Sequence, residues 1–138
     1  MAWVIDTCVL IDIAINDPRF ALLSAQKLDE LRNNTLIVCP ITLIELAPAF
    51  NGKVIDIHHF LDAIGVEYHA NWQTTDTENT IRTWAAYTSA RRAGLTVKRP
   101  IADIMIGAFA QERGGLVTRN PADFSAWFPK LTIVNPVS

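Results

Sequence analysis

Trp3-Val4-Ile5-Asp6-Thr7, near the start of the chain, is the stretch that decides the fold. Its apolar residues predict a short buried strand, and Asp6 places a carboxylate where that strand ends. In open α/β sheets, ligands bind beyond the carboxyl ends of the strands. Asp6 therefore stands where a site is expected, and other polar groups should meet it there.

The composition indicates a globular domain rather than a disordered or strongly basic chain. Half of the 138 residues are hydrophobic and the formal net charge is −2, so nucleic-acid contacts must come from local patches. We expect one domain over residues 1–138. The two isolated cysteines predict reduced thiols. Without a secretion signal or a long apolar run, the protein is expected to be cytoplasmic, with no membrane span.

Segments typical of strands and helices alternate along the chain. Further strands are predicted at 35–39, 66–68, 116–118 and 131–134, which with the first gives about five short strands. Strands that alternate with helices form mostly parallel sheets with right-handed crossovers. In the longest predicted helix, 74–93, the residues expected to face inward are Ile81, Trp84, Ala85 and Thr88.

This topology brings four carboxylates to one edge of the sheet. Asp6 ends the first strand, and Glu45 lies in the helix that leaves the second. Asp123 follows a later strand, and Asp103 begins the helix that leads into that strand. Because a crossover helix runs antiparallel to its strands, its N-terminus lies at the edge where the strands end. All four acids are therefore expected at the carboxyl edge.

Three of these acids also have a simpler explanation. The segment 42–45 (TLIE) matches a capping box, which would account for Glu45. Asp103 and Asp123 follow prolines at predicted helix starts, where the helix dipole favours acids. No cap explains Asp6, a carboxylate at the end of an apolar strand.

The convergence of four acids would need protonation or a cation. Two carboxylates about 4 Å apart repel by about 4 kcal/mol at an effective dielectric constant near 20. A cluster of oxygen ligands without thiols suits Mg²⁺ or Mn²⁺ rather than zinc. Since these ions commonly activate water against phosphates, phosphodiester hydrolysis is the chemistry that the cluster favours.

Four blocks carry a family resemblance in the expected order: 4–12 (VIDTCVLID), 41–46 (ITLIEL), 103–108 (DIMIGA) and 116–124 (LVTRNPADF). Together they resemble the motifs of PIN-domain ribonucleases, most closely the VapC-type toxins of toxin–antitoxin systems. The resemblance implies a three-layer α/β/α fold with a mostly parallel sheet. It also implies a Mg²⁺- or Mn²⁺-dependent endoribonuclease that cuts tRNA, rRNA or mRNA, is inhibited by a cognate antitoxin and forms a homodimer.

The resemblance also assigns roles to particular residues. The metal ligands, direct or through water, would be Asp6, Glu45, Asp103 and Asp123. The supporting polar residues, which would position a metal-bound water or a carboxylate, are Thr7, Thr118 and Asn120. Asp12 matches the opening block, with a hydrogen-bonding or helix-surface role. The sequence departs from the family at Ile104, where a small residue is usual, and this puts the local helix packing in question.

Candidate RNA contacts are Lys98, Arg99 and Arg119, because neutralising phosphates supplies much of nucleic-acid affinity. Arg119 is the strongest of them, since it lies between two site residues. Three other functions stay open. They are a PIN-domain nuclease of RNA processing, a catalytically silent PIN-fold binding module, and a receiver or phosphoryl-transfer protein. A receiver or phosphoryl-transfer protein would need an acid at position 8, where the chain has Cys8.

Overall fold

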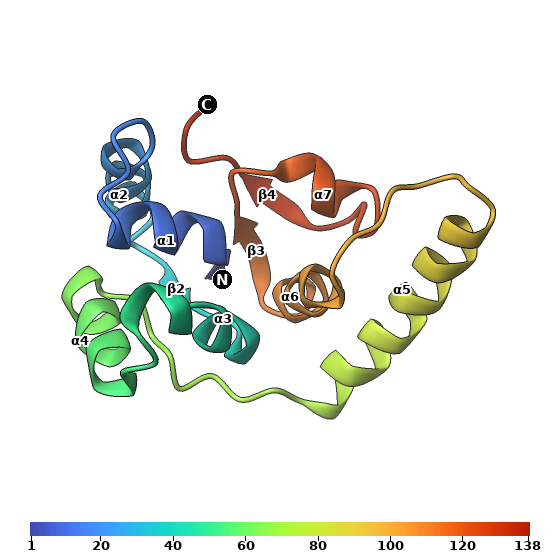
Figure 1. Ribbon diagram of the computed structural model, residues 1–138, viewed down its shortest axis with the longest axis horizontal. Coiled ribbons are helices and arrows are strands. Elements are labelled where there is room, and N and C mark those ends of the chain that lie inside the picture. The colour runs from blue at the N-terminus through green and yellow to red at the C-terminus, as the bar shows by residue number, and fades with distance from the viewer.

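The computed structural model describes all 138 residues as a parallel β-sheet covered by helices (Figure 1). The strands are β1 (Ala2–Ile5), β2 (Thr35–Ile37), β3 (Gly114–Val117) and β4 (Thr132–Val134). The helices are α1 (Thr7–Ala14), α2 (Ala21–Glu30), α3 (Pro40–Glu45), α4 (Val54–Ile64), α5 (Thr74–Arg92), α6 (Ile101–Gln111) and α7 (Pro121–Ser125), with a 3₁₀ turn, η1 (Ala47–Phe50), after α3. None of these helices is long and apolar enough to cross a bilayer.

The sheet has the strand order β2-β1-β3-β4, and every pairing in it is parallel. The fifth strand expected near residue 67 is reduced to a single bridge between Ile37 and Glu67. Glu67 N–H donates to the carbonyl of Leu36 at 2.8 Å, and Val38 N–H donates to the carbonyl of Glu67 at 3.0 Å. The parallel pairing of the four strands confirms the predicted sheet, and the bridge at Glu67 is all that forms of the fifth strand.

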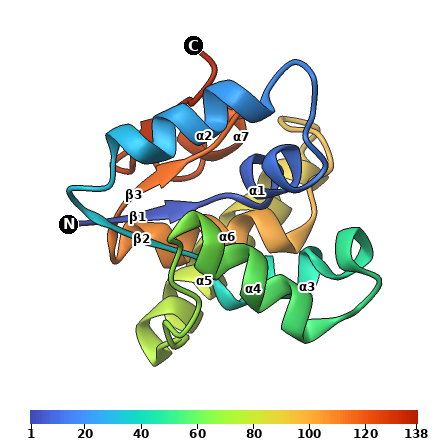
Figure 2. The same cartoon turned by 90° about the vertical axis from the view of Figure 1, so that its left-hand side faces the viewer.

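Each face of the sheet has its own apolar core, as the period of two along a strand requires. Trp3 and Ile5 point into a core shared with α1, α2 and α4, whereas Val4 points into one shared with α6 and α7. Figure 2 shows α2 on one side of the strands and α6 on the other. This is the expected three-layer α/β/α arrangement. Ile104 is buried in the second core, so the sheet accommodates the larger side chain there.

The strand order places a topological switch point between β1 and β3. From β1 the chain first adds β2 on one side, and it later adds β3 on the other side. The two connections leave the sheet in opposite directions, which opens a crevice at the carboxyl ends of β1 and β3. Asp6 N–H donates to the carbonyl of Val117 at 2.9 Å, so the chain leaving β1 stays fixed to β3 at this point.

The prediction for the inner face of α5 is partly wrong. Ile81 and Ala85 are exposed, while Thr80 and Tyr87 are buried. The helix packs mainly along α6, so only a narrow strip of it is covered. A buried ion pair, Asp76 with Arg113 at 2.8 Å, orients its first turn. The side of α5 that carries Asp76, Thr80 and Tyr87 therefore faces the protein.

Candidate metal site

Asp6 lies at the switch point, buried to all but 6% of its surface. It follows β1 directly and is the N-cap of α1, where its Oδ1 accepts the N–H of Thr7 at 2.8 Å. Its Oδ2 accepts the hydroxyl of Thr118, which follows β3, at 2.7 Å. Burial raises the pKa of Asp6, and these hydrogen bonds act in the opposite direction. The carboxylate is therefore fixed in place by both central strands.

Glu45 reaches the same place from α3. The hydroxyl of Thr7 donates to its Oε1 at 2.6 Å, and the Oγ1 atoms of Thr7 and Thr42 are 3.0 Å apart. Because Thr7 gives its one proton to Glu45, Thr42 must be the donor in the second contact. A short chain of hydroxyls thus links α1 to α3 and holds Glu45 beside Asp6.

The capping-box explanation of Glu45 is wrong. Helix α3 begins at Pro40, with Cys39 as its N-cap, so Thr42 lies inside the first turn and Glu45 is the last helical residue. Proline is well suited to the first helical position, which moves the start of the helix ahead of the threonine. Glu45 therefore has no capping role.

Asp103 lies in the first turn of α6 and is only partly exposed. Burial, followed by the negative charges of Asp6, Glu45 and Asp123, raises its pKa from 3.8 to about 6, and the charge of Arg99 opposes this. No hydrogen bond stabilises its carboxylate. Burial and the charges of the other three acids therefore both disfavour the ionised form of Asp103.

Asp123 lies in the first turn of α7 and is paired with a cation. Nη1 of Arg99 is 2.6 Å from its Oδ1, and both side chains are about one quarter exposed, at 25% and 29%. Arg99 precedes α6 in the loop that follows α5. Asp103 and Asp123 both lie in the first turn of a helix, where the helix dipole favours an acid. The simpler explanation of these two acids therefore also holds.

The donor set fits a hard divalent cation, although its carboxylates have other partners in this structure. No three acidic, imidazole or thiol groups stand close enough to enclose an ion between them. Hydroxyls hold Asp6 and Glu45, and Arg99 holds Asp123. Four carboxylates that repel one another, one of them without a hydrogen bond, are the oxygen ligands that Mg²⁺ and Mn²⁺ prefer.

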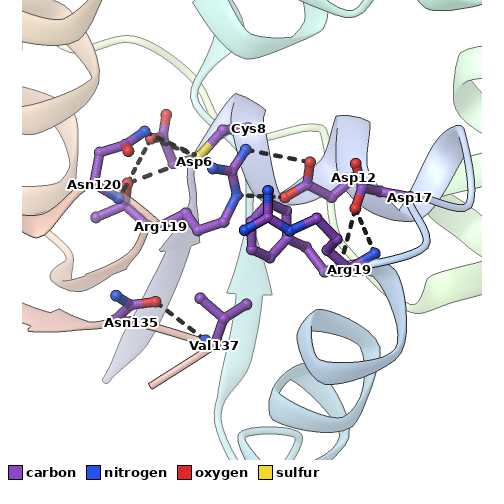
Figure 3. Close-up of polar contacts among 11 residues, drawn as sticks. Asp6, Cys8, Asp12, Asp17, Arg19, Arg119, Asn120, Asn135 and Val137 are labelled. Atoms are coloured by element: carbon purple, nitrogen blue, oxygen red, sulfur yellow. Dashed lines mark hydrogen bonds and ion pairs between the residues drawn. The ribbon is translucent and has the colours of Figure 1, made fainter.

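Cys8 belongs to this site, which the sequence did not indicate. Its thiol donates to Oδ2 of Asp6 at 3.4 Å, and its Sγ is 3.8 Å from the side-chain amide of Asn120 (Figure 3). Asn120 also donates its backbone N–H to the hydroxyl of Thr118 at 3.1 Å. Burial raises the pKa of Cys8 to about 12, so it acts as a neutral hydrogen-bond donor.

Arg119, the strongest RNA candidate, is held in an ion pair and is partly exposed. Its Nε is 2.6 Å from Oδ2 of Asp12, a residue only 4% exposed (Figure 3). Its guanidinium lies 4.3 Å from the centroid of the Phe20 ring. Asp12 thus has the expected hydrogen-bonding role, but not at the helix surface. Lys98, by contrast, is exposed in the loop before α6.

The four acids lie outside the hollows of the protein surface. Three hollows are lined by residues of 62–69, by the start of α5 with the residues that follow α6, and by α3 with α4, and none includes Asp6, Glu45, Asp103 or Asp123. Small ligands usually bind in concave pockets that enclose most of their surface. None of the three hollows holds the four acids in this way.

The fold and the site define an α/β protein with an acidic cluster at the carboxyl edge of a parallel sheet. The model of the PIN domain matches residues 3–126, and the chain belongs to the PIN-domain family, whose members are nucleases. The fold is similar to that of VapBC2 from Rickettsia felis, whose crystal structure was solved with a bound DNA fragment from the VapBC2 promoter. That match has 22% identity, covers 98% of each chain and has a TM-score of 0.72. No curated protein matches the sequence.

The raised pKa of Asp103 gives a prediction about stability. Because the folded state binds the proton more tightly than the unfolded state, stability from this group falls as the pH rises from 3.8 to about 6. Without divalent ions, Asp103→Asn should be more stable than the wild type at pH 8 by about 1–2 kcal/mol, after allowance for solvent screening. The gain should disappear near pH 4.

Urea unfolding in EDTA, followed by tryptophan fluorescence at both pH values, measures this difference. Asp29→Asn is the matched control, because Asp29 is exposed in α2 and should show no such gain. An Asp103→Asn variant with wild-type stability at pH 8 would show that neither burial nor the neighbouring acids disfavour the charged carboxylate of Asp103.

Proposed function

We propose that this chain is a Mg²⁺- or Mn²⁺-dependent endoribonuclease that serves as the toxin of a toxin–antitoxin pair. The observation that carries the proposal is the placement of the four acids: Thr118 and Thr7 fix the carboxylates of Asp6 and Glu45 at the carboxyl edge of the sheet, and Asp103 and Asp123 lie in the first turns of α6 and α7. Membership in a nuclease family supports the reaction class. The metal ligands in this proposal are Asp6, Glu45, Asp103 and Asp123.

The polar neighbours of these acids have positioning roles in the proposal. Thr118 orients Asp6 and Thr7 orients Glu45, so both carboxylates present fixed oxygens. Asn120 lies beside Thr118 at the start of α7, where its amide faces Cys8. A bound Mg²⁺ or Mn²⁺ supplies an activated water and neutralises charge on the phosphodiester under attack. The preset carboxylates then need little reorganisation to receive it.

An RNA substrate is supported by the cations of the loops that carry the site. Lys98 is exposed beside it. Arg119 keeps 26% of its side chain exposed even in its ion pair. Cations placed around an acidic site offset the repulsion between its carboxylates and phosphates.

The toxin role is supported by the similarity of the fold to VapBC2 over nearly the whole chain. In this role the chain works in the cytoplasm as a homodimer, and a small antitoxin protein inhibits it. A PIN nuclease that acts in RNA processing would have the same site but no antitoxin partner. A catalytically silent binding module would have the same fold but would not cleave RNA.

Cleavage of structured RNA tests the nuclease proposal. The purified protein should cut tRNA or rRNA with Mg²⁺ or Mn²⁺, and EDTA should abolish the cutting. Asp6→Asn and Asp103→Asn should each lower the rate at least about a hundredfold, because each removes a charged metal ligand. Asp29→Asn should keep the wild-type rate. Wild-type cleavage by a folded Asp6→Asn variant would contradict the assignment.

Growth on expression in bacteria tests the toxin role separately. The wild-type chain should arrest growth, Asp6→Asn should not, and co-expression of a small protein encoded next to its gene should restore growth. Growth unaffected by an active, expressed nuclease would argue instead for a role in RNA processing.

A further inference from the structure

Arg99 is the one cation that forms an ion pair with an acid of the candidate metal site. Its Nη1 lies 2.6 Å from Oδ1 of Asp123. Its charge also lowers the pKa of Asp103, which the three other acids raise. A single guanidinium therefore acts on two of the four acids and offsets part of their repulsion.

From this geometry we infer that Arg99 is an internal counter-ion that competes with the divalent metal for Asp123. The inference rests on the proposed function and adds a form of regulation to it. When a divalent ion binds, Asp123 turns from the guanidinium to the metal. The released Arg99 then binds a phosphate of the RNA that crosses the site.

The loop that carries Arg99 is built so that the side chain can move while the backbone stays fixed. The backbone N–H of Arg99 donates to the hydroxyl of Tyr87, and that hydroxyl donates to the carbonyl of Val97. Tyr87 is only 2% exposed and is packed in α5. Two hydrogen bonds to one buried residue hold the loop, so rotation of the Arg99 side chain needs no change in the fold.

The pair is also weak enough to exchange. Both side chains are about one quarter exposed, at 25% and 29%, and ion pairs near the surface change an equilibrium by at most about fivefold. A divalent ion shared with other carboxylates can overcome such a contact. A phosphate then offers the released guanidinium two oxygens in the planar geometry that arginine prefers.

The other arginine of the site has no such freedom. Arg119 is paired with Asp12, which is only 4% exposed, and its guanidinium is stacked on Phe20. Breaking that contact would leave a buried carboxylate without a partner, which is costly. Asp12 is also not one of the four site acids. Exchange between a carboxylate and a phosphate is therefore a property of Arg99.

Binding of Mn²⁺ to the full-length protein without RNA tests the counter-ion role, with free Mn²⁺ measured by electron paramagnetic resonance. Arg99→Gln should bind Mn²⁺ about three- to fivefold more tightly than the wild type, because the competitor is gone. Lys98→Gln is the matched control. It removes the same charge one residue away, where no ion pair exists, and should change the affinity by less than about twofold.

A double-mutant cycle assigns the effect to the pair. In an Asp123→Asn background, Arg99→Gln should no longer tighten Mn²⁺ binding. Cleavage kinetics test the second half of the inference, since Arg99→Gln should raise the KM for RNA while lowering the Mn²⁺ concentration needed for half-maximal rate. Damage to the fold would instead impair both quantities.

Each result has a clear meaning. A wild type that binds Mn²⁺ and an Arg99→Gln variant that binds it no better would overturn the counter-ion role alone. Tighter Mn²⁺ binding with an unchanged KM would overturn the transfer of Arg99 to phosphate. A wild-type chain that binds no Mn²⁺ would count against the proposed function as well.

Discussion

The hydrogen bond from Thr118 to Asp6 is the contact on which the site depends, because it joins the ends of the two central strands. Strands β1 and β3 run in parallel, and their connections leave in opposite directions, so both side chains face the same crevice. The hydroxyl supplies the partner that a carboxylate with only 6% exposure requires. The neighbouring acids reach this fixed point from α3, α6 and α7.

The fold keeps like charges close together and limits the cost with internal partners. Thr7 donates to Glu45, and Arg99 pairs with Asp123. Asp103 has no hydrogen bond to its carboxylate, and burial together with the charges of the other three acids raises its pKa to about 6. Sites of this kind lower stability in favour of function, and a bound cation returns that stability when it neutralises them.

Much of this arrangement could be predicted from the sequence, because strand ends and helix starts fix where Asp6, Asp103 and Asp123 must lie. Pairings between distant side chains could not. Cys8 reaches the site by a turn of α1 that no spacing indicates, and Arg99 meets Asp123 only because two loops converge. The inner face of α5 was predicted only in part, because Thr80 and Tyr87 are buried there while Ile81 and Ala85 are exposed. The PIN family was recognisable because four motifs occur in the expected order along the chain, and this order does not depend on how individual helices are rotated.

The central claim is that the four carboxylates share a divalent cation. Anomalous X-ray diffraction from crystals soaked in MnCl₂ tests it most directly, because the signal locates manganese itself. The account predicts an anomalous peak at the carboxyl ends of β1 and β3, within about 2.0–2.6 Å of oxygens from Asp6 and Asp103 or one water away from them. A peak confined to other surface acids, or no peak at saturating MnCl₂, would contradict it.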